Sequence, residues 1–84
     1  MGRLIAVRRY RVGRDLRPLE LTDEAGYLEG LSRLSPGEIV ELLDVPSSRG
    51  LEERRALVES WSVCTLGHGG TVYRGICRWL ESSG

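Results

Sequence analysis

Apolar and basic positions alternate near the start of the chain. Residues 4–12 are rich in β-branched and aromatic side chains, and from Tyr10 onward apolar residues alternate with arginine. This pattern predicts a strand that reaches towards Leu16. Gly13 is predicted to form a bulge that bends or splits this strand, and Pro18 to end it or to place it at a sheet edge.

The next apolar positions recur at helical spacing. The Thr22 hydroxyl can cap a helix, and the two acids that follow it complement the positive end of the helix dipole. We therefore predict a helix over residues 22–34, broken by residues 35–37. Two glycines lie inside it, and each costs up to about 1 kcal/mol relative to alanine, which a close approach of helix to sheet would explain. The apolar stripe consists of Tyr27, Leu28, Leu31 and Leu34.

A second strand and a second helix are predicted further along. Residues 38–43 carry apolar side chains on both faces, as a central strand covered by helices would. Residues 44–50 are predicted to be a loop. Residues 51–60 are predicted to be a helix, with two glutamates in its first turn. Its apolar residues on one side are Leu51, Leu57, Val58 and Trp61.

The last part of the chain predicts a hairpin. Residues 61–66 and 71–80 are the two strands, and the glycine-rich residues 67–70 are the turn. On the last strand, Arg74 and Arg78 are predicted to point to one face. The opposite face is predicted to carry Tyr73, Gly75, Cys77 and Trp79.

These elements predict one α/β domain over residues 1–84, in which residues 1–11 form a basic strand or an extension. The order strand, helix, strand, helix, strand, strand favours a two-layer sandwich with a mixed four-stranded sheet and two helices on one face. Apolar residues make up 40% of the chain, yet no run is long enough to span a membrane. Because the early apolar stretch is also too short for a signal peptide, we expect a cytoplasmic protein.

Charge is distributed unevenly along the sequence. All 12 basic residues are arginines, and the first 17 residues contain six of them against one acid. The first 17 residues thus carry about +5 and the remainder about −5. Forked guanidinium groups could bind phosphate or an acidic partner. The candidate residues are Arg8, Arg9, Arg11 and Arg14. The alternative is a solvated strand face that acidic elements neutralise.

Candidate catalytic groups are few. Cys64 and Cys77 are too few for a disulfide scaffold, and their spacing fits no zinc template, so we expect neither a metal site nor a cofactor. Either thiol could pair with His68, the one histidine, as a nucleophile. The alternative is that the thiols pack in the core and His68 is a solvated turn residue. The balance favours a protein that is not an enzyme.

Several local sequences, at matching intervals, resemble the TusA-like (SirA-like) family of small sulfur carriers. They are Asp15-Leu16-Arg17 with Leu19, then Pro36-Gly37-Glu38, Asp44-Val45-Pro46, and Tyr73 to Arg78. In that family a cysteine just before the first helix carries the persulfide sulfur. Here that position is occupied by Leu21 or Thr22, so the resemblance implies the fold without the reactive thiol. It implies a non-catalytic binding module related to sulfur trafficking, which docks on a sulfurtransferase or another relay protein.

Two other functions remain open. The first is an active sulfur carrier or sulfurtransferase that uses Cys64 or Cys77. The second is a nucleotide- or nucleic-acid-binding module similar to a PilZ domain, in which arginine-rich starts and strand hairpins recur. The chain lacks the Arg-x-x-x-Arg and Asp-x-Ser-x-x-Gly motifs of that family. Its aromatic residues form no stacking platform, so we do not expect nucleic acid as a partner.

Overall fold

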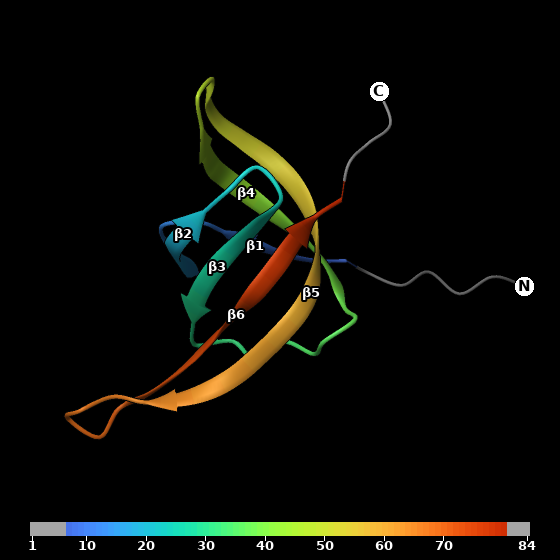
Figure 1. Ribbon diagram of the computed structural model, residues 1–84. Helices are drawn as coiled ribbons and strands as arrows, with labels where there is room; N and C mark the ends of the chain where they lie inside the picture. The colour runs from blue at the N-terminus through green and yellow to red at the C-terminus, as the bar shows by residue number, and fades with distance from the viewer. Residues whose placement is uncertain (1–6, 81–84) are drawn as a thin grey trace, which may run out of the picture.

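The computed structural model describes residues 7–80, and every regular element within them is a strand (Figure 1). The strands are β1 (Arg8–Arg11), β2 (Leu16–Leu21), β3 (Ala25–Gly30), β4 (Ile39–Ser47), β5 (Gly50–Thr65) and β6 (Thr71–Trp79). They form one sheet in the order β1-β4-β5-β6-β3-β2, in which β1 and β4 are parallel and all other neighbours antiparallel. The predicted two-layer sandwich with two helices and four strands is therefore wrong. Residues 7–80 include no helix that is long and apolar enough to cross a membrane.

The sheet curls until its two edge strands approach each other. Val12 and Leu16 form an isolated parallel bridge, and the Gly13 amide donates to the Leu16 carbonyl at 2.7 Å. Gly13 has a φ of 97°, which glycine adopts without a steric penalty. Gly13 was predicted to be a bulge that bends or splits the first strand; it lies instead in the turn that separates β1 from β2, so the strand is split but by a turn. Pro18 lies within β2 at the sheet edge. Its missing N–H therefore costs no hydrogen bond between strands.

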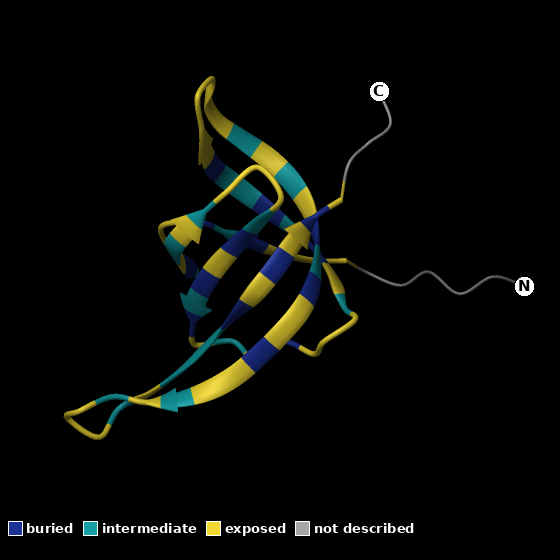
Figure 2. Cartoon of the chain, in the orientation of Figure 1, coloured by how far each residue is buried: buried dark blue, intermediate teal, exposed yellow. Residues whose placement is uncertain are grey.

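One hydrophobic core fills the inside of the curl (Figure 2). It collects the inward-facing side of each strand, because successive side chains of a strand point to opposite faces. The predicted faces of β6 are confirmed, since Gly75, Cys77 and Trp79 are buried while Arg78 is exposed. The buried residues are Tyr10, Val12, Leu16, Leu28, Leu34, Val40, Leu42, Val45, Ala56, Val58, Trp61, Cys77 and Trp79.

The segment predicted as the first helix forms β3 and the turns around it. Thr22 caps a turn instead of a helix: its hydroxyl accepts the amide of Ala25 at 3.1 Å and donates to the Ala25 carbonyl at 3.1 Å. The two glycines face inward where the packing is tightest. A Cβ at Gly26 would lie 2.9 Å from the Trp79 ring, and one at Gly30 would lie 2.4 Å from Leu16. These glycines are required by close packing under large side chains, and a helix has no such need for them.

The segment predicted as the second helix is the first half of β5. Ala56 and Val58 face the core, and a β-bulge between Val58 and Ser60 then shifts the alternation so that Trp61 is buried as well. A bulge places two residues opposite one and reverses which parity faces inward. The resulting apolar spacing resembles that of a helix, and this explains the wrong prediction.

The strand predicted over residues 38–43 is present, but it is longer and covered on one face only. Val40, Leu42 and Val45 are buried, whereas Ile39 is 44% exposed. A bulge between Leu42 and Val45 contains Asp44, whose φ of 58° is unusual for a residue other than glycine. Asp44-Val45-Pro46, which the family resemblance places in a loop, therefore lies inside β4.

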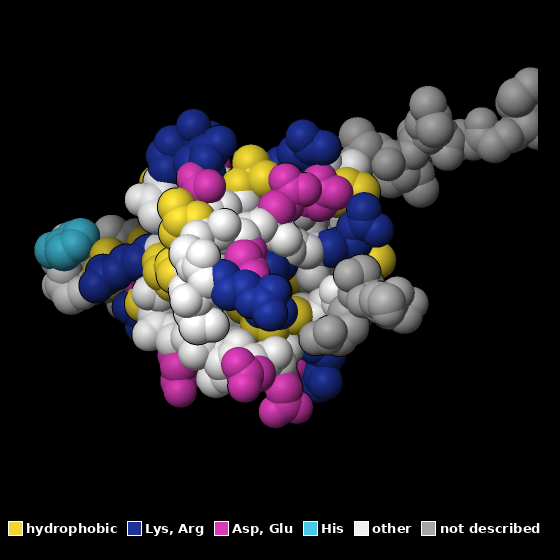
Figure 3. All heavy atoms as spheres, turned by 90° about the horizontal axis from the view of Figure 1, so that it is seen from above, with side chains coloured by type: hydrophobic (Ala, Val, Ile, Leu, Met, Phe, Trp, Pro, Cys, Tyr) yellow, Lys and Arg dark blue, Asp and Glu magenta, His cyan; other side chains and the backbone are white. Residues whose placement is uncertain are grey.

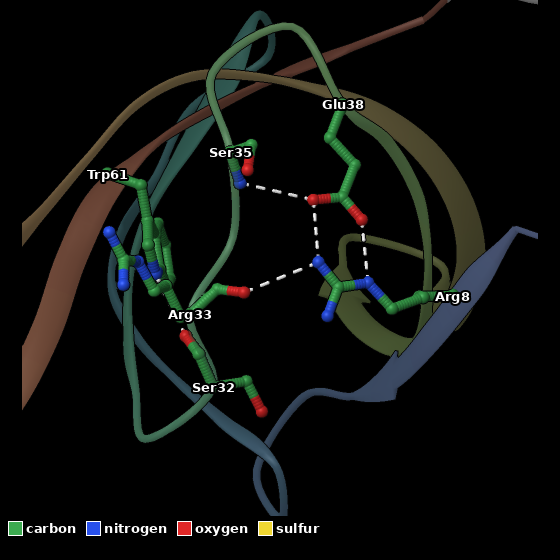
Figure 4. Close-up of polar contacts among 6 residues, drawn as sticks. All are labelled: Arg8, Ser32, Arg33, Ser35, Glu38 and Trp61. Carbon is green, nitrogen blue, oxygen red and sulfur yellow. Dashed lines mark hydrogen bonds and ion pairs between the residues drawn. The ribbon is translucent and has the colours of Figure 1, made fainter.

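Two tryptophans anchor the connections at opposite ends of the curl. The Trp79 Nε1 donates to the Thr22 carbonyl at 2.8 Å, and the Trp61 Nε1 donates to the Ser32 carbonyl at 2.9 Å. Near Trp61, an ion pair between Arg8 and Glu38 holds the residue 31–38 connection against β1 (Figure 4). Each indole N–H thus finds a partner while the ring stays in the core.

Candidate functional site

A pocket lies where the two edge strands meet. It has a volume of about 670 Å³ and is formed by β1, the turn after it, the start of β2, and the end of β3 with the residues that follow. We call it the seam pocket. This volume is within the usual range for sites that bind small molecules. Its lining residues are Arg9, Tyr10, Gly13, Arg14, Asp15, Leu16, Arg17, Glu29, Gly30, Leu31, Ser32 and Val72.

Three arginines stand on the rim of the seam pocket with their side chains largely in solvent. The exposed fractions are 67% for Arg9, 71% for Arg14 and 75% for Arg17. Between them the floor carries the buried apolar residues Tyr10 and Leu16. Guanidinium groups in such a position can donate forked hydrogen bonds to a phosphate or carboxylate.

Each rim arginine has an acidic neighbour, but the contacts differ. Arg9 donates one hydrogen bond from Nε to Glu41 at 2.8 Å. Arg17 is 4.0 Å from Glu29, which is beyond hydrogen-bond distance.

Arg14 instead makes a two-point contact with Asp15, at 3.1 Å from Nε and 3.0 Å from Nη2. The pKa of Asp15 lies below its usual value. The main cause is the hydrogen bonding from Arg14, and the hydrogen bond from the Arg11 amide is a smaller cause. Of the three rim arginines, Arg17 has the loosest contact with an acid and Arg14 the most extensive.

The four arginines predicted from the sequence divide into two pairs. Arg9 and Arg14 reach the seam pocket, as an anion site requires. Arg8 forms a fork with Glu38 at 2.7 Å from both Nε and Nη2, and Arg11 pairs with Asp44. These two arginines connect β1 and the residues beside it to β4, and neither lines the pocket.

Arg17 is a site residue that the sequence analysis did not select. It belongs to the same basic N-terminal stretch, and the one available signal was its place between two apolar residues at the start of β2. Leu31, 77% exposed on the pocket rim, was missed for another reason: it was assigned to the stripe of a helix that does not exist.

The two cysteines lie at separate places on the β5–β6 ladder. Cys64 is opposite Val72 and partly exposed, while Cys77 is opposite Val58 and fully buried. Burial raises the pKa of the Cys77 thiol to about 11, so it is protonated at neutral pH. Both thiols are free, and neither lines the seam pocket.

His68 is an exposed residue of the β5–β6 turn. Its Nδ1 accepts the amide of Gly70 at 3.3 Å, so it helps to close the turn. Figure 3 shows the histidine at a tip that projects from the body of the molecule. Within residues 7–80, no group of three or more side chains of the metal-binding types is close enough to hold a metal ion.

The positions that stand for the family cysteine are at the end of β2. Leu21 is the last residue of that strand, and Thr22 begins the turn to β3. A thiol at either position would therefore not lie at a helix N-terminus, where backbone amides and the dipole lower a thiol pKa. The physical reason for a reactive cysteine at this place does not apply to this fold.

Charges of both signs are interspersed over the surface. Figure 3 shows arginine and acidic side chains side by side on the face it displays. The pairs between the β1 region and β4 account for much of this mixing, since basic and acidic segments about 30 residues apart in sequence become neighbours. These pairs offset part of the charge asymmetry of the sequence, and Arg9 belongs both to them and to the rim of the seam pocket.

Comparison with known proteins gives no relative on which a function could rest. No family model, no curated protein and no solved structure matches this chain. The function must therefore be argued from the seam pocket itself.

Proposed function

We propose that this chain is a small binding module that takes a phosphate-bearing nucleotide in the seam pocket. The observation that carries the proposal is the position of Arg9, Arg14 and Arg17, three largely exposed guanidinium groups around one pocket of about 670 Å³. Arginine presents five N–H donors in a planar fork, and this geometry matches phosphate oxygens.

The other lining residues favour a nucleotide over a bare phosphate. Leu31 on the rim and Val72 from β6 supply apolar surface, and Ser32 supplies a hydroxyl. A nucleobase could lie on the apolar side while the phosphate meets the arginines. Small-molecule sites combine apolar surface with polar groups that fix the orientation of the ligand, and the seam pocket offers both.

The alternatives that involve sulfur stay predictions. The non-catalytic sulfur-trafficking module and the carrier that uses Cys64 or Cys77 both come from a family resemblance whose implied fold differs from the fold described above. A direct test of the second is mass spectrometry after incubation with a persulfide donor. It requires a gain of one sulfur atom that the Cys64→Ser or Cys77→Ser variant loses.

The nucleotide proposal is tested by titrating the protein with ATP, GTP and a cyclic dinucleotide in calorimetry at low and high salt. We expect saturable binding of at least one probe that weakens as salt rises, because the contacts are with exposed charges. Arg17→Ala should weaken binding about tenfold, the loss of one charge-assisted contact. Arg49→Ala, which removes an exposed arginine from the distant β4–β5 turn, is the matched control and should change little.

Two results would contradict the proposal. One is the absence of saturable binding of all three probes at low salt. The other is an equal loss of affinity in Arg17→Ala and Arg49→Ala, which would indicate unspecific attraction to positive charge.

A further inference from the structure

One carboxylate in the seam pocket already makes the contacts that an anionic ligand would make. The Asp15 side chain accepts two hydrogen bonds from Arg14, at 3.1 Å to Oδ1 and 3.0 Å to Oδ2. Its Oδ2 also accepts the backbone amide of Arg11 at 2.7 Å. A guanidinium fork combined with a backbone N–H is a common way in which proteins bind phosphate oxygens.

The turn between β1 and β2 places Asp15 there. The amides of Arg14 and Asp15 both donate to the Arg11 carbonyl, at 3.2 Å and 2.7 Å, and Gly13 supplies the positive φ that closes the turn. The Asp15 side chain folds back across this turn, and its carboxylate accepts the hydrogen bond from the Arg11 amide. Its position is therefore fixed by the backbone, while Arg14 contacts it from the solvent side.

The pair can be opened at low cost. The Arg14 side chain is 71% exposed and that of Asp15 is 30% exposed, so both charges stay hydrated when they separate. Exposed ion pairs contribute little to stability because water hydrates both charges once they separate. A phosphate with up to two negative charges can therefore compete with one carboxylate for the same guanidinium.

We propose that Asp15 is a built-in competitor of the ligand: its carboxylate and the ligand phosphate compete for the Arg14 guanidinium, which turns from one to the other. The inference rests on the proposed function of the seam pocket and adds its regulation: Asp15 sets the affinity and raises the negative charge that a ligand needs. A ligand with a single weak charge is excluded, and a phosphate monoester or a di- or triphosphate is admitted.

The test compares ATP affinity in Asp15→Asn with that of the unchanged protein. Asparagine keeps an oxygen that can accept the Arg11 amide, but it loses the charge that holds Arg14. We expect ATP to bind about three- to tenfold more tightly. Asp23→Asn makes the same charge change in the β2–β3 turn, outside the seam pocket, and should alter the affinity less than twofold.

A double-mutant cycle with Arg14→Ala shows whether the effect passes through Arg14. In the Arg14→Ala background, Asp15→Asn should no longer tighten binding. A gain that persists there would mean that Asp15 acts only as a general negative charge, and it would overturn the inference. Asp15→Ser, whose hydroxyl can also accept the Arg11 amide, replaces Asp15→Asn if the asparagine variant melts at a lower temperature.

The inference and the proposed function fail in different ways. If the unchanged protein binds ATP and Asp15→Asn binds it equally or less tightly, Asp15 is not a competitor but the pocket function stands. If neither protein nor any variant binds ATP or the other nucleotide probes, the pocket function falls and the inference falls with it.

Discussion

Among the glycines of residues 7–80, Gly75 leaves the least room for a side chain. A Cβ added there would lie 1.8 Å from the Ser60 carbonyl oxygen and 2.7 Å from the ring of Trp61. The Ser60 carbonyl belongs to the β5 bulge, and Trp61 is the first buried residue after it. The glycine, the bulge and the tryptophan therefore form one packing unit in which the backbone cannot shift independently.

We expect Gly75→Ala to destabilise the protein by about 3 kcal/mol, because the methyl group overlaps backbone atoms instead of a movable side chain. The measurement is the free energy of unfolding in urea. Gly67→Ala is the matched control: nothing lies within 4 Å of its added Cβ, and it should change stability by less than about 0.5 kcal/mol. Equal losses in the two variants would show that the Gly75 contact is not the cause.

At the residue scale, the sequence predicts which side chains share a face and which can form local hydrogen bonds. It does not predict the secondary structure in which they do so. The alternation of β6 was visible because Arg74 and Arg78 alternate with Gly75 and Cys77, and the structure confirms these faces. Thr22 was recognised as a capping residue, yet its hydroxyl serves a turn. Local hydrogen bonding of threonine looks the same in both settings, so the residue alone cannot distinguish them.

Among the elements, the residue 31–38 connection is linked to β1 by the ion pair between Arg8 and Glu38. The Glu38 carboxylate accepts both nitrogens of the Arg8 fork at 2.7 Å and the Ser35 amide at 3.1 Å, as Figure 4 shows. Arg8 also reaches the Arg33 carbonyl at 3.3 Å. The same carboxylate thus connects the first strand to the connection that closes this end of the curl.

The hydrogen bonds from Arg8 lower the pKa of Glu38 below its usual value. A carboxyl whose pKa is lower in the folded state stabilises the fold above its unfolded pKa and loses this effect as the pH falls through its folded pKa. We expect Glu38→Gln to cost about 1 kcal/mol of unfolding free energy at pH 7. The difference from the unchanged protein should shrink as the pH falls below the unfolded pKa and through the lowered folded pKa of Glu38, and it should be lost once the carboxyl is protonated in the folded state as well.

Urea unfolding of both proteins at a series of pH values measures this effect. Glu53→Gln is the control, since it removes an exposed glutamate from β5. A Glu38→Gln difference that stays constant from pH 7 to pH 3 would contradict the role of the charge and would leave only a packing effect.

Also at the element scale, the two predicted helices failed for a shared reason. In β5 the bulge after Val58 moves Trp61 to the core side. In β3, glycines occupy every inward-facing position except that of Leu28. Both features disturb the simple alternation that identifies a strand. The signal in favour of strands is the cost of two glycines within one helix, which a helix does not need.

At the scale of the whole molecule, the order of the strands decides which acid each N-terminal arginine meets. Arg8, Arg9 and Arg11 meet Glu38, Glu41 and Asp44 because β1 lies parallel to β4, a pairing between segments about 30 residues apart. A basic N-terminal segment and a more acidic remainder can be read from the sequence. Their register cannot, because it follows from the order of all six strands. Of the four arginines predicted to bind an anion, Arg9 and Arg14 line the seam pocket, and Arg17 lines it without having been among the four.

The fully buried thiol of Cys77 reports on the stability of the whole sheet. Cys77 lies on the central strand β6, paired with Val58 on one side and Gly26 on the other, and its pKa is raised to about 11. A thiol that is both buried and protonated reacts only after the strands around it separate. We expect Cys77, in a Cys64→Ser variant, to react with a thiol-specific reagent at neutral pH only at the rate of global unfolding. Its protection should fall with urea in parallel with the fluorescence transition.

Cys64, partly exposed on the ladder beyond the core, should react in the folded protein of a Cys77→Ala variant, provided that the alanine variant still folds at lower temperature. Rapid labelling of Cys77 without urea would mean that the sheet opens locally between β5 and β6, and the curled core would then not behave as one cooperative unit.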